Sequence, residues 1–299
     1  MFEVKIATAP CSWGVWYADG TPSGTPWELF LDQAAEAGYQ ALELGPDGYL
    51  PTEESRLLEE LGKRNLSVCA GTACYAFDQG ADFAAFRPRT EALCRRLTAL
   101  GAKYLVTMDE SDVGARSEKK KALTPREWDC FFRKVRDMGE FTKREFGIDV
   151  VYHPHIKTMV EYEEEIVRLL DATGLDLCFD TGHHAYANGN GQPEEPSAPA
   201  FLRRFAKRIA YLHFKQMDGA VFARVQRENL TSDEAFDIDV MCDLPDGVIS
   251  FQEIRRVLEE IEFHGIGIVE SDMPRATNAQ AFASAKRNLT YLREVGIIA

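Results

Sequence analysis

Residues 148–183 read IDVVYHPHIKTMVEYEEEIVRLLDATGLDLCFDTGH and contain one complete strand–helix–strand unit. Ile148–Tyr152 and Leu175–Phe179 are short apolar runs, typical of parallel strands that are covered on both faces. Glu161–Ala172 between them carries apolar residues at the 3.6-residue spacing of an amphipathic helix. Gly174 follows this helix directly, where a glycine usually ends a helix. The unit therefore predicts two parallel strands joined by a helix.

The same alternation of strand and helix extends along the whole chain. The expected strands are Val4–Ala9, Ala41–Leu44, Leu66–Ala70, Lys103–Thr107, Ile148–Tyr152, Leu175–Phe179, Ile209–Phe214 and Ile266–Val269. The expected helices are Trp27–Ala37, Glu53–Arg64, Phe83–Leu100, Pro125–Phe146, Glu161–Ala172, Pro199–Ala206, Phe251–Ile261 and Asn278–Val295. Eight strands and eight helices in strict alternation predict an α/β fold, a single-domain (β/α)8 TIM barrel over residues 1–299. A doubly wound sheet would use fewer units and would usually have a glycine-rich phosphate turn after its first strand, where this chain has Pro10-Cys11-Ser12-Trp13-Gly14.

The composition argues against several classes of partner. The 299 residues include 34 Lys and Arg against 48 Asp and Glu, which gives a formal net charge of −14. A negative field repels phosphate backbones, and the densest basic run, 119–121, is short and expected in a solvated loop, so we expect no nucleic-acid partner. No run approaches the ~18 apolar residues of a membrane span, and the first residues do not resemble a signal peptide, so we expect no membrane partner.

The cysteines indicate the compartment. The seven cysteines are scattered and include no Cys-x-x-Cys pair, which is typical of reduced thiols in apolar surroundings. We therefore expect a cytoplasmic enzyme. A homodimer and a homotetramer both remain open, because the sequence shows no patch that indicates the oligomeric state.

Long connections follow three of the expected strands. Residues 109–124 are polar and charged, residues 216–250 mix aromatic and acidic residues, and residues 188–199 are rich in Gly and Pro. Each connection leaves the C-terminal end of a strand, which is the catalytic face of a TIM barrel. Long loops on that face are usually lids or substrate-binding elements.

Residues suited to metal binding stand at the ends of the last four strands. They are His155, Asp180, His213 and Glu270, in chain order. The C-terminal ends of barrel strands converge on one pocket, so these side chains should meet although they are far apart in the sequence. Two imidazoles and two carboxylates suit a divalent ion, and a site without thiolates favours open coordination over a closed structural site. We expect Mn²⁺ or Co²⁺ first, with Mg²⁺, Fe²⁺ or Zn²⁺ also compatible, and His153 is an alternative ligand from the fifth strand.

Packing alone offers another interpretation of each residue. A single histidine at a strand end is more often a buried, hydrogen-bonded side chain than a ligand. Asp180-Thr181-Gly182-His183 also suits a helix N-cap and a tight turn. Four such residues on four consecutive strands are hard to obtain from packing needs, so the pattern favours a metal centre.

These motifs resemble those of the xylose-isomerase-like sugar isomerase and epimerase superfamily, whose barrels hold a divalent metal with acid, Asp, His and Glu ligands on strands five to eight. Within it, the chain is most similar to the inosose dehydratases. This resemblance rests on the start Ala7-Thr8-Ala9-Pro10-Cys11-Ser12-Trp13-Gly14, on Tyr152-His153-Pro154-His155 with Thr158, and on Phe179-Asp180-Thr181-Gly182-His183. It covers nearly the whole chain and implies a metal-dependent TIM-barrel enzyme.

One departure from the superfamily pattern bears on the reaction. Many of the epimerases carry a Glu at the end of strand five, paired with the strand-eight Glu across the substrate carbon, and here His153 holds that place. A β-elimination does not need matched carboxylates but a Lewis acid, a base and a proton donor. We expect Lys215, two residues after His213, to hold the enolate oxygen or to act as the base. His183 should move a proton or bind a hydroxyl, and His153 should take part in catalysis where it is not a ligand.

Two further residues are candidates for substrate binding beside Lys215 and His183. Glu43 ends the second strand and can bind a substrate hydroxyl or orient a ligand, although a turn acid is an equal alternative. Trp13 can wall the pocket, because sugars and cyclitols stack on aromatic rings, although core packing explains it at least as well.

The sequence thus predicts a metal-dependent dehydratase of a polyol or keto-cyclitol such as 2-keto-myo-inositol, in inositol catabolism. The main alternative is a metal-dependent isomerase or epimerase of an inosose or ketose. An endonuclease-like barrel for abasic DNA would need further zinc ligands and a basic groove. A non-catalytic sugar-binding protein would keep its function when metal is chelated.

Overall fold

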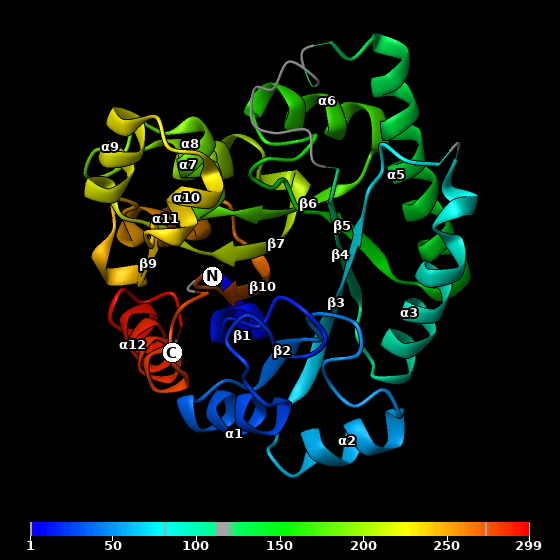
Figure 1. The fold of residues 1–299 in the computed structure, drawn as a ribbon, viewed down its shortest axis with the longest axis horizontal. Helices are drawn as coiled ribbons and strands as arrows, with labels where there is room; N and C mark the ends of the chain where they lie inside the picture. The colour runs from blue at the N-terminus through cyan, green and yellow to red at the C-terminus, as the bar shows by residue number, and fades with distance from the viewer. Residues whose placement is uncertain (1, 81, 112–119, 121, 273, 299) are drawn as a thin grey trace.

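Eight parallel strands close a barrel in the computed structural model, which describes residues 2–80, 82–111, 120, 122–272 and 274–298. Going round the barrel, the strands follow the order β1-β10-β7-β6-β5-β4-β3-β2, with the helices around them (Figure 1). Their bounds are β1 Glu3–Thr8, β2 Ala41–Glu43, β3 Ser67–Tyr75, β4 Tyr104–Asp109, β5 Asp149–Tyr152, β6 Asp176–Asp180, β7 Ile209–Phe214 and β10 His264–Val269. The predicted TIM barrel is confirmed.

The eight predicted helices are all present, with bounds that shift by a few residues. They are α1 Trp27–Ala37, α2 Glu54–Gly62, α3 Arg87–Ala99, α5 Pro125–Phe146, α6 Glu163–Thr173, α8 Ser197–Arg204, α11 Phe251–Glu260 and α12 Asn278–Glu294. Capping residues and glycines determine where the helices begin and end. In α5, Thr124 and Glu127 form a capping box at the start, and Gly147 ends the helix with φ 68°, a left-handed conformation that glycine adopts without strain.

In the described part of the chain, three short helices and a small sheet were not predicted. They are α7 Thr181–Asn188, α9 Gly219–Glu228 and α10 Ser232–Asp237, with the antiparallel pair β8 Gln216–Met217 and β9 Met241–Cys242. The 3₁₀ turns are Pro10–Trp13, Phe83–Ala85, Ala206–Arg208 and Leu244–Asp246. The connection 216–250 is therefore a folded insertion on the catalytic face. Of the connection 109–124, residues 112–119 and 121 lie outside the described part of the chain.

The basic run at 119–121 is only partly described. Lys119 and Lys121 lie outside the described residues, but Lys120 is buried. Its Nζ lies 2.7 Å from Glu165 Oε2 on α6. The expected solvated loop is therefore wrong for Lys120, because an ion pair compensates its buried charge.

The core has two layers, because successive side chains of a strand point to opposite faces. The inner layer fills the barrel and consists of Ala7, Ala9, Ala70, Val106, Val151, Cys178, Tyr211 and Ile268. The larger layer lies between the strands and the helices and includes Leu42, Leu105, Leu177, Leu212 and Phe214. Side chains that continue the inner row past the end of a strand must face the barrel mouth, and this places the site.

None of the helices in the described ranges is long and apolar enough to cross a membrane. All seven cysteines are free thiols.

Candidate metal centre and active site

The strand register sets three of the predicted ligands side by side. Asp180 on β6 pairs with His213 on β7, and His213 pairs with Ile268 on β10. Glu270 follows two residues after Ile268, and its backbone N–H continues the ladder by donating to Phe214 O at 3.1 Å. Asp180, His213 and Glu270 each continue the inner row of their strand, so all three face the axis of the barrel.

His213 lies at the centre of this group. Its Nδ1 is 3.1 Å from Glu270 Oε2 and 3.8 Å from Asp180 Oδ2. Its Nε2 is 3.2 Å from Oε1 of Glu43, which ends β2 on the other side of the barrel. His213 Nδ1 and Asp180 Oδ2 are buried and make no hydrogen bond within the described residues. Buried polar atoms are usually hydrogen-bonded, so atoms of this kind are candidates for metal ligands.

Lys215 reaches into the same group with its ammonium. Its Nζ lies 2.6 Å from Asp272 Oδ2, 3.0 Å from Glu270 Oε2 and 3.3 Å from Asp180 Oδ2. Burial opposes the charge, but the three carboxylates outweigh it and raise the pKa of Lys215 well above its usual value. Lys215 is therefore held as an ammonium.

The same charges act on the partners of Lys215. Burial would raise the pKa of the Glu270 carboxyl, but the positive charges of His213 and Lys215 outweigh this and hold that pKa well below its usual value. In the same way, Lys215 and His183 overcome the effect of burial on Asp272 and lower its pKa. Both carboxyl groups are therefore ionised.

The four acidic residues of the centre carry more charge than its cations balance. Glu43, Asp180, Glu270 and Asp272 are all buried, and the basic groups that contact them in the described chain are Lys215, His213 and His183. Burial would lower the pKa of His213, but Cys178, Glu270 and Glu43 outweigh this and raise that pKa well above its usual value. Even with both histidines counted as cations, the formal charges of these described side chains leave one negative charge uncompensated. Buried charge is costly unless it is paired, so the donor set fits a divalent cation.

The histidines of the fifth strand occupy two different places. His153, the next inward-facing residue after Val151, has its ring centroid 4.7 Å from that of His213. The His155 ring lies 4.3 Å from the ring of His183, and its Nδ1 is 2.9 Å from Ile156 O. Burial is the main cause that lowers the pKa of His153 well below its usual value and that of His155 to about 3, so both rings are neutral. The structure thus brings His153 beside His213 and places His155 beside His183.

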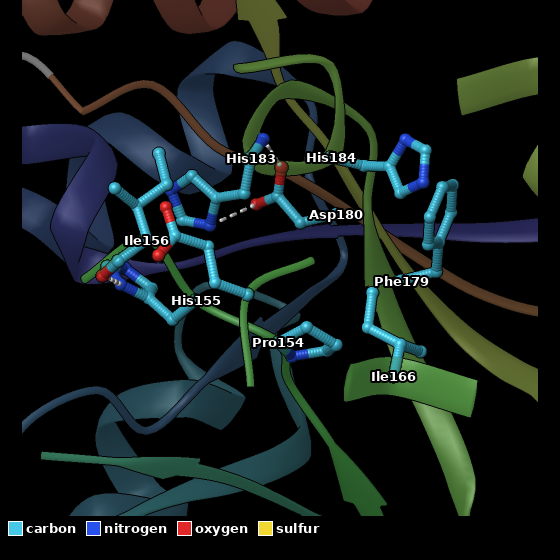
Figure 2. A pocket seen from close by; sticks show the side chains of 9 residues that line it. Pro154, His155, Ile156, Ile166, Phe179, Asp180, His183 and His184 are labelled. Carbon is cyan, nitrogen blue, oxygen red and sulfur yellow. Dashed lines mark hydrogen bonds and ion pairs between the residues drawn. The ribbon is translucent and has the colours of Figure 1, made fainter. Parts of the chain in front are cut away.

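His183 joins the cluster from the first turn of α7. Asp180 Oδ1 caps this helix by accepting the His183 backbone N–H at 2.8 Å, which explains why the short motif can serve as strand end and helix start at once. The His183 Nε2 lies 3.1 Å from Lys215 Nζ and 3.3 Å from Asp272 Oδ2. Figure 2 shows Asp180 linked to His183, with His155 beside them and His184 turned away toward Phe179.

Trp13 lies outside this cluster. It is fully buried, its Nε1 donates to Gln33 Oε1 at 2.7 Å, and its ring packs edge-on against Phe30 of α1 at 5.0 Å. It belongs to the layer between strands and helices, where packing decides its position. The structure therefore does not bring Trp13 to the candidate site, whereas Glu43 is part of it.

Two residues of the cluster were not assigned a role from the sequence. Asp272 follows Glu270 by two residues, and both carboxylates contact Lys215 Nζ. This two-residue spacing after a strand was an available signal. Cys11 donates from its Sγ to Glu270 Oε1 at 3.2 Å. No sequence signal separates Cys11 from the other cysteines.

The insertion after β7 adjoins the site. The ring of Phe236 on α10 lies 6.3 Å from that of His183. Asp233 of the same helix accepts from Lys157 Nζ at 2.8 Å, which ties the insertion to the loop after β5. The connection 216–250, expected to be a lid or a substrate-binding element, thus lies beside the cluster through α10.

Comparison with known proteins agrees with this architecture. The model of the xylose isomerase-like TIM barrel family matches residues 31–295. The rhizopine catabolism protein MocC of Rhizobium meliloti is 30% identical over 282 residues, covering 91% of this chain and 82% of its own. An inosose dehydratase of Bacillus licheniformis is 29% identical over 294 residues, covering 92% and 93%. A crystal structure of the IolI protein with a bound zinc atom superposes with a TM-score of 0.69 at 15% identity, covering 97% of this chain and 98% of its own. The chain belongs to the xylose isomerase-like TIM barrel family.

Proposed function

We propose that this protein is a metal-dependent dehydratase that removes water from a keto-cyclitol such as 2-keto-myo-inositol, in inositol catabolism. Several relatives named inosose dehydratase align with the chain over nearly the full length of both proteins. The observation that carries the proposal is the meeting of Asp180, His213 and Glu270 around a surplus of buried negative charge, with Lys215 and His183 beside them.

For the metal, we place His153 rather than His155 with Asp180, His213 and Glu270. The ring of His153 adjoins that of His213, whereas His155 faces His183. Both rings are neutral, so charge does not distinguish the two histidines as ligands. The choice of His153 rests on its position beside His213. Nitrogen and carboxylate donors without thiolate favour Mn²⁺ or Co²⁺, with Mg²⁺, Fe²⁺ and Zn²⁺ as further candidates.

A divalent ion at this place would supply a Lewis acid that polarises the substrate carbonyl. The ammonium of Lys215 would donate a hydrogen bond to the substrate oxygen on which negative charge develops. His183 would take the proton from the carbon next to the carbonyl and deliver it to the departing hydroxyl. The C–H and C–O bonds break, a C=C bond forms and water leaves. Glu43 contacts His213, so its role would be to orient that ring.

The proposal also covers the domain organisation, the location and the partners of the protein. We infer one domain over residues 1–299, a cytoplasmic location and a polyol-type substrate, with no nucleic-acid or membrane partner. The family match over residues 31–295 and the net charge of −14 support this view. A homodimer or a homotetramer is compatible with it.

Incubation with 2-keto-myo-inositol tests the proposal. We expect a new diketone absorbance together with a product lighter by one water. An isomer of unchanged mass would instead indicate the isomerase or epimerase alternative. Absence of any product in the metal-loaded protein would contradict both.

Replacement of Lys215 separates catalysis from metal binding. Lys215→Ala should keep the bound metal, because the lysine is not a ligand, and should lower kcat by about 10²- to 10³-fold, the usual effect of removing one hydrogen-bond donor to a developing oxyanion. Steady-state kinetics with parallel metal analysis measures both. Turnover at the wild-type rate would remove Lys215 from the mechanism.

A further inference from the structure

The ammonium of Lys215 stands among groups that the proposed metal also needs. Its Nζ is 3.0 Å from Glu270 Oε2 and 3.3 Å from Asp180 Oδ2, and both residues belong to the proposed ligand set. A divalent cation on these carboxylates would repel the ammonium strongly at such short range in a buried site. If the centre holds both, Lys215 needs an acceptor outside the ligand set.

Asp272 provides this acceptor. Its Oδ2 is 2.6 Å from Lys215 Nζ, closer than any other carboxylate that contacts the ammonium in the described chain. It lies three residues after the end of β10, and the residue is 8% exposed. His183 Nε2, at 3.3 Å from the same oxygen, fixes the carboxylate from α7.

The stem of Lys215 permits little other movement. The residue is 1% exposed, and Gly182 of α7 packs so closely that an added Cβ would lie 2.8 Å from Lys215 Cγ. The ammonium can therefore shift only between acceptors that already surround it. Among these, Asp272 is the carboxylate that the metal leaves available.

We infer that Asp272 is a positioning residue that draws the Lys215 ammonium away from Asp180 and Glu270, so that the ammonium and a divalent cation occupy the centre together. This inference rests on the metal centre of the proposed function. Without the Asp272 carboxylate, the ammonium stays on the two ligand carboxylates and competes with the cation.

A double-mutant cycle on Mn²⁺ affinity tests the inference. Isothermal titration of the full chain, stripped of metal by chelation, compares wild type, Asp272→Asn, Lys215→Met and the double variant at one pH. We expect Asp272→Asn to weaken Mn²⁺ binding about tenfold, in the range typical of outer residues of a metal site. Lys215→Met should bind Mn²⁺ at least as tightly as wild type. The double variant should match Lys215→Met, because the competitor is gone.

The cycle separates this role from two others. If Asp272 were itself a ligand, or acted only by its charge, Asp272→Asn would weaken Mn²⁺ binding by the same factor in the Lys215→Met background as in wild type, and that result would overturn the inference. Unchanged affinity in Asp272→Asn would also overturn it. Asp272→Glu should restore most of the affinity, while Asp171→Asn, exposed on α6, controls for the change in net charge.

The controls also keep the two proposals apart. Lys215→Gln replaces the Met variant if thermal unfolding shows that Lys215→Met does not fold. Wild-type protein that binds no Mn²⁺ would contradict the metal centre and this inference together. Tight wild-type binding with an additive cycle would contradict this inference alone.

Discussion

A carboxylate lies close to each ring nitrogen of His213. Glu43 contacts Nε2 at 3.2 Å, and Glu270 contacts Nδ1 at 3.1 Å. When a histidine binds a metal through one nitrogen, a carboxylate on the other fixes the tautomer and the orientation of the ring. Since Asp180 and Glu270 both lie on the Nδ1 side, Nδ1 is the nitrogen that would bind the metal, and Glu43 is its orienting partner.

Glu43→Gln tests this role. The amide keeps the shape of the side chain but loses the charge that orients the ring, so Mn²⁺ affinity should fall about tenfold or more. Competition with a fluorescent chelator measures the affinity. Saturation at high Mn²⁺ should still reach the wild-type stoichiometry, and an affinity equal to that of wild type would show that Glu43 does not orient His213.

Gly182 is required by the position of Lys215. A Cβ at Gly182 would lie 2.8 Å from Lys215 Cγ and 2.9 Å from its Cβ, closer than packed atoms tolerate. Gly182→Ala should therefore displace the lysine and lower kcat at least tenfold, with a loss of stability of about 1–3 kcal/mol. Kinetics and urea unfolding measure the two effects. Wild-type kcat in a folded Gly182→Ala variant would show that the position of Lys215 does not matter.

At the scale of elements, the loops of the catalytic face are tied to one another by buried polar groups. Asp109 at the end of β4 accepts hydrogen bonds from Phe77 N at 3.1 Å, Ser111 Oγ at 2.6 Å and Met159 N at 3.1 Å. These donors belong to the loops after β3, β4 and β5. One carboxylate thus joins three neighbouring loops, although burial raises its pKa and the hydrogen bonds only partly offset this.

Asp109→Asn should weaken this connection. The amide has one oxygen where the carboxylate has two, so one N–H donor loses its acceptor and faces an NH₂ group instead. The free energy of unfolding should fall by about 1–3 kcal/mol. Urea denaturation measures the change, with Asp171→Asn on the exposed side of α6 as a control expected within about 0.5 kcal/mol of wild type. Equal stability of the two variants would contradict the role of Asp109.

The elements show where the sequence was sufficient and where it was not. The apolar strands and the helix-ending glycines predicted every strand of the barrel. By contrast, β3 continues to Tyr75, five residues past the expected end, because the whole segment from Ala70 pairs with β4 although Gly71 and Thr72 are weak strand signals. Helix α7 resembled a turn, because Asp180 is both the strand end and the N-cap.

Across the whole molecule, closure of the barrel brings together residues that are remote in the chain. His213 and Glu43 are 170 residues apart, and Lys215 and Asp272 are 57 apart. The rule that strand ends converge was enough to predict that Asp180, His213 and Glu270 meet. It could not choose between His153 and His155, since the direction of the chain after β5 depends on contacts such as His155 N to Val160 O. It could not exclude Trp13 either, because the local sequence does not show which layer a buried ring joins.

The metal content of His213→Ala tests the central claim most directly. His213 lies among all the proposed ligands, whereas His264, at the opposite end of β10 and exposed, offers a matched histidine control. Elemental analysis after purification and Mn²⁺ loading should find the metal in wild type and in His264→Ala, and none in folded His213→Ala. Full metal occupancy in His213→Ala would contradict the metal centre described here.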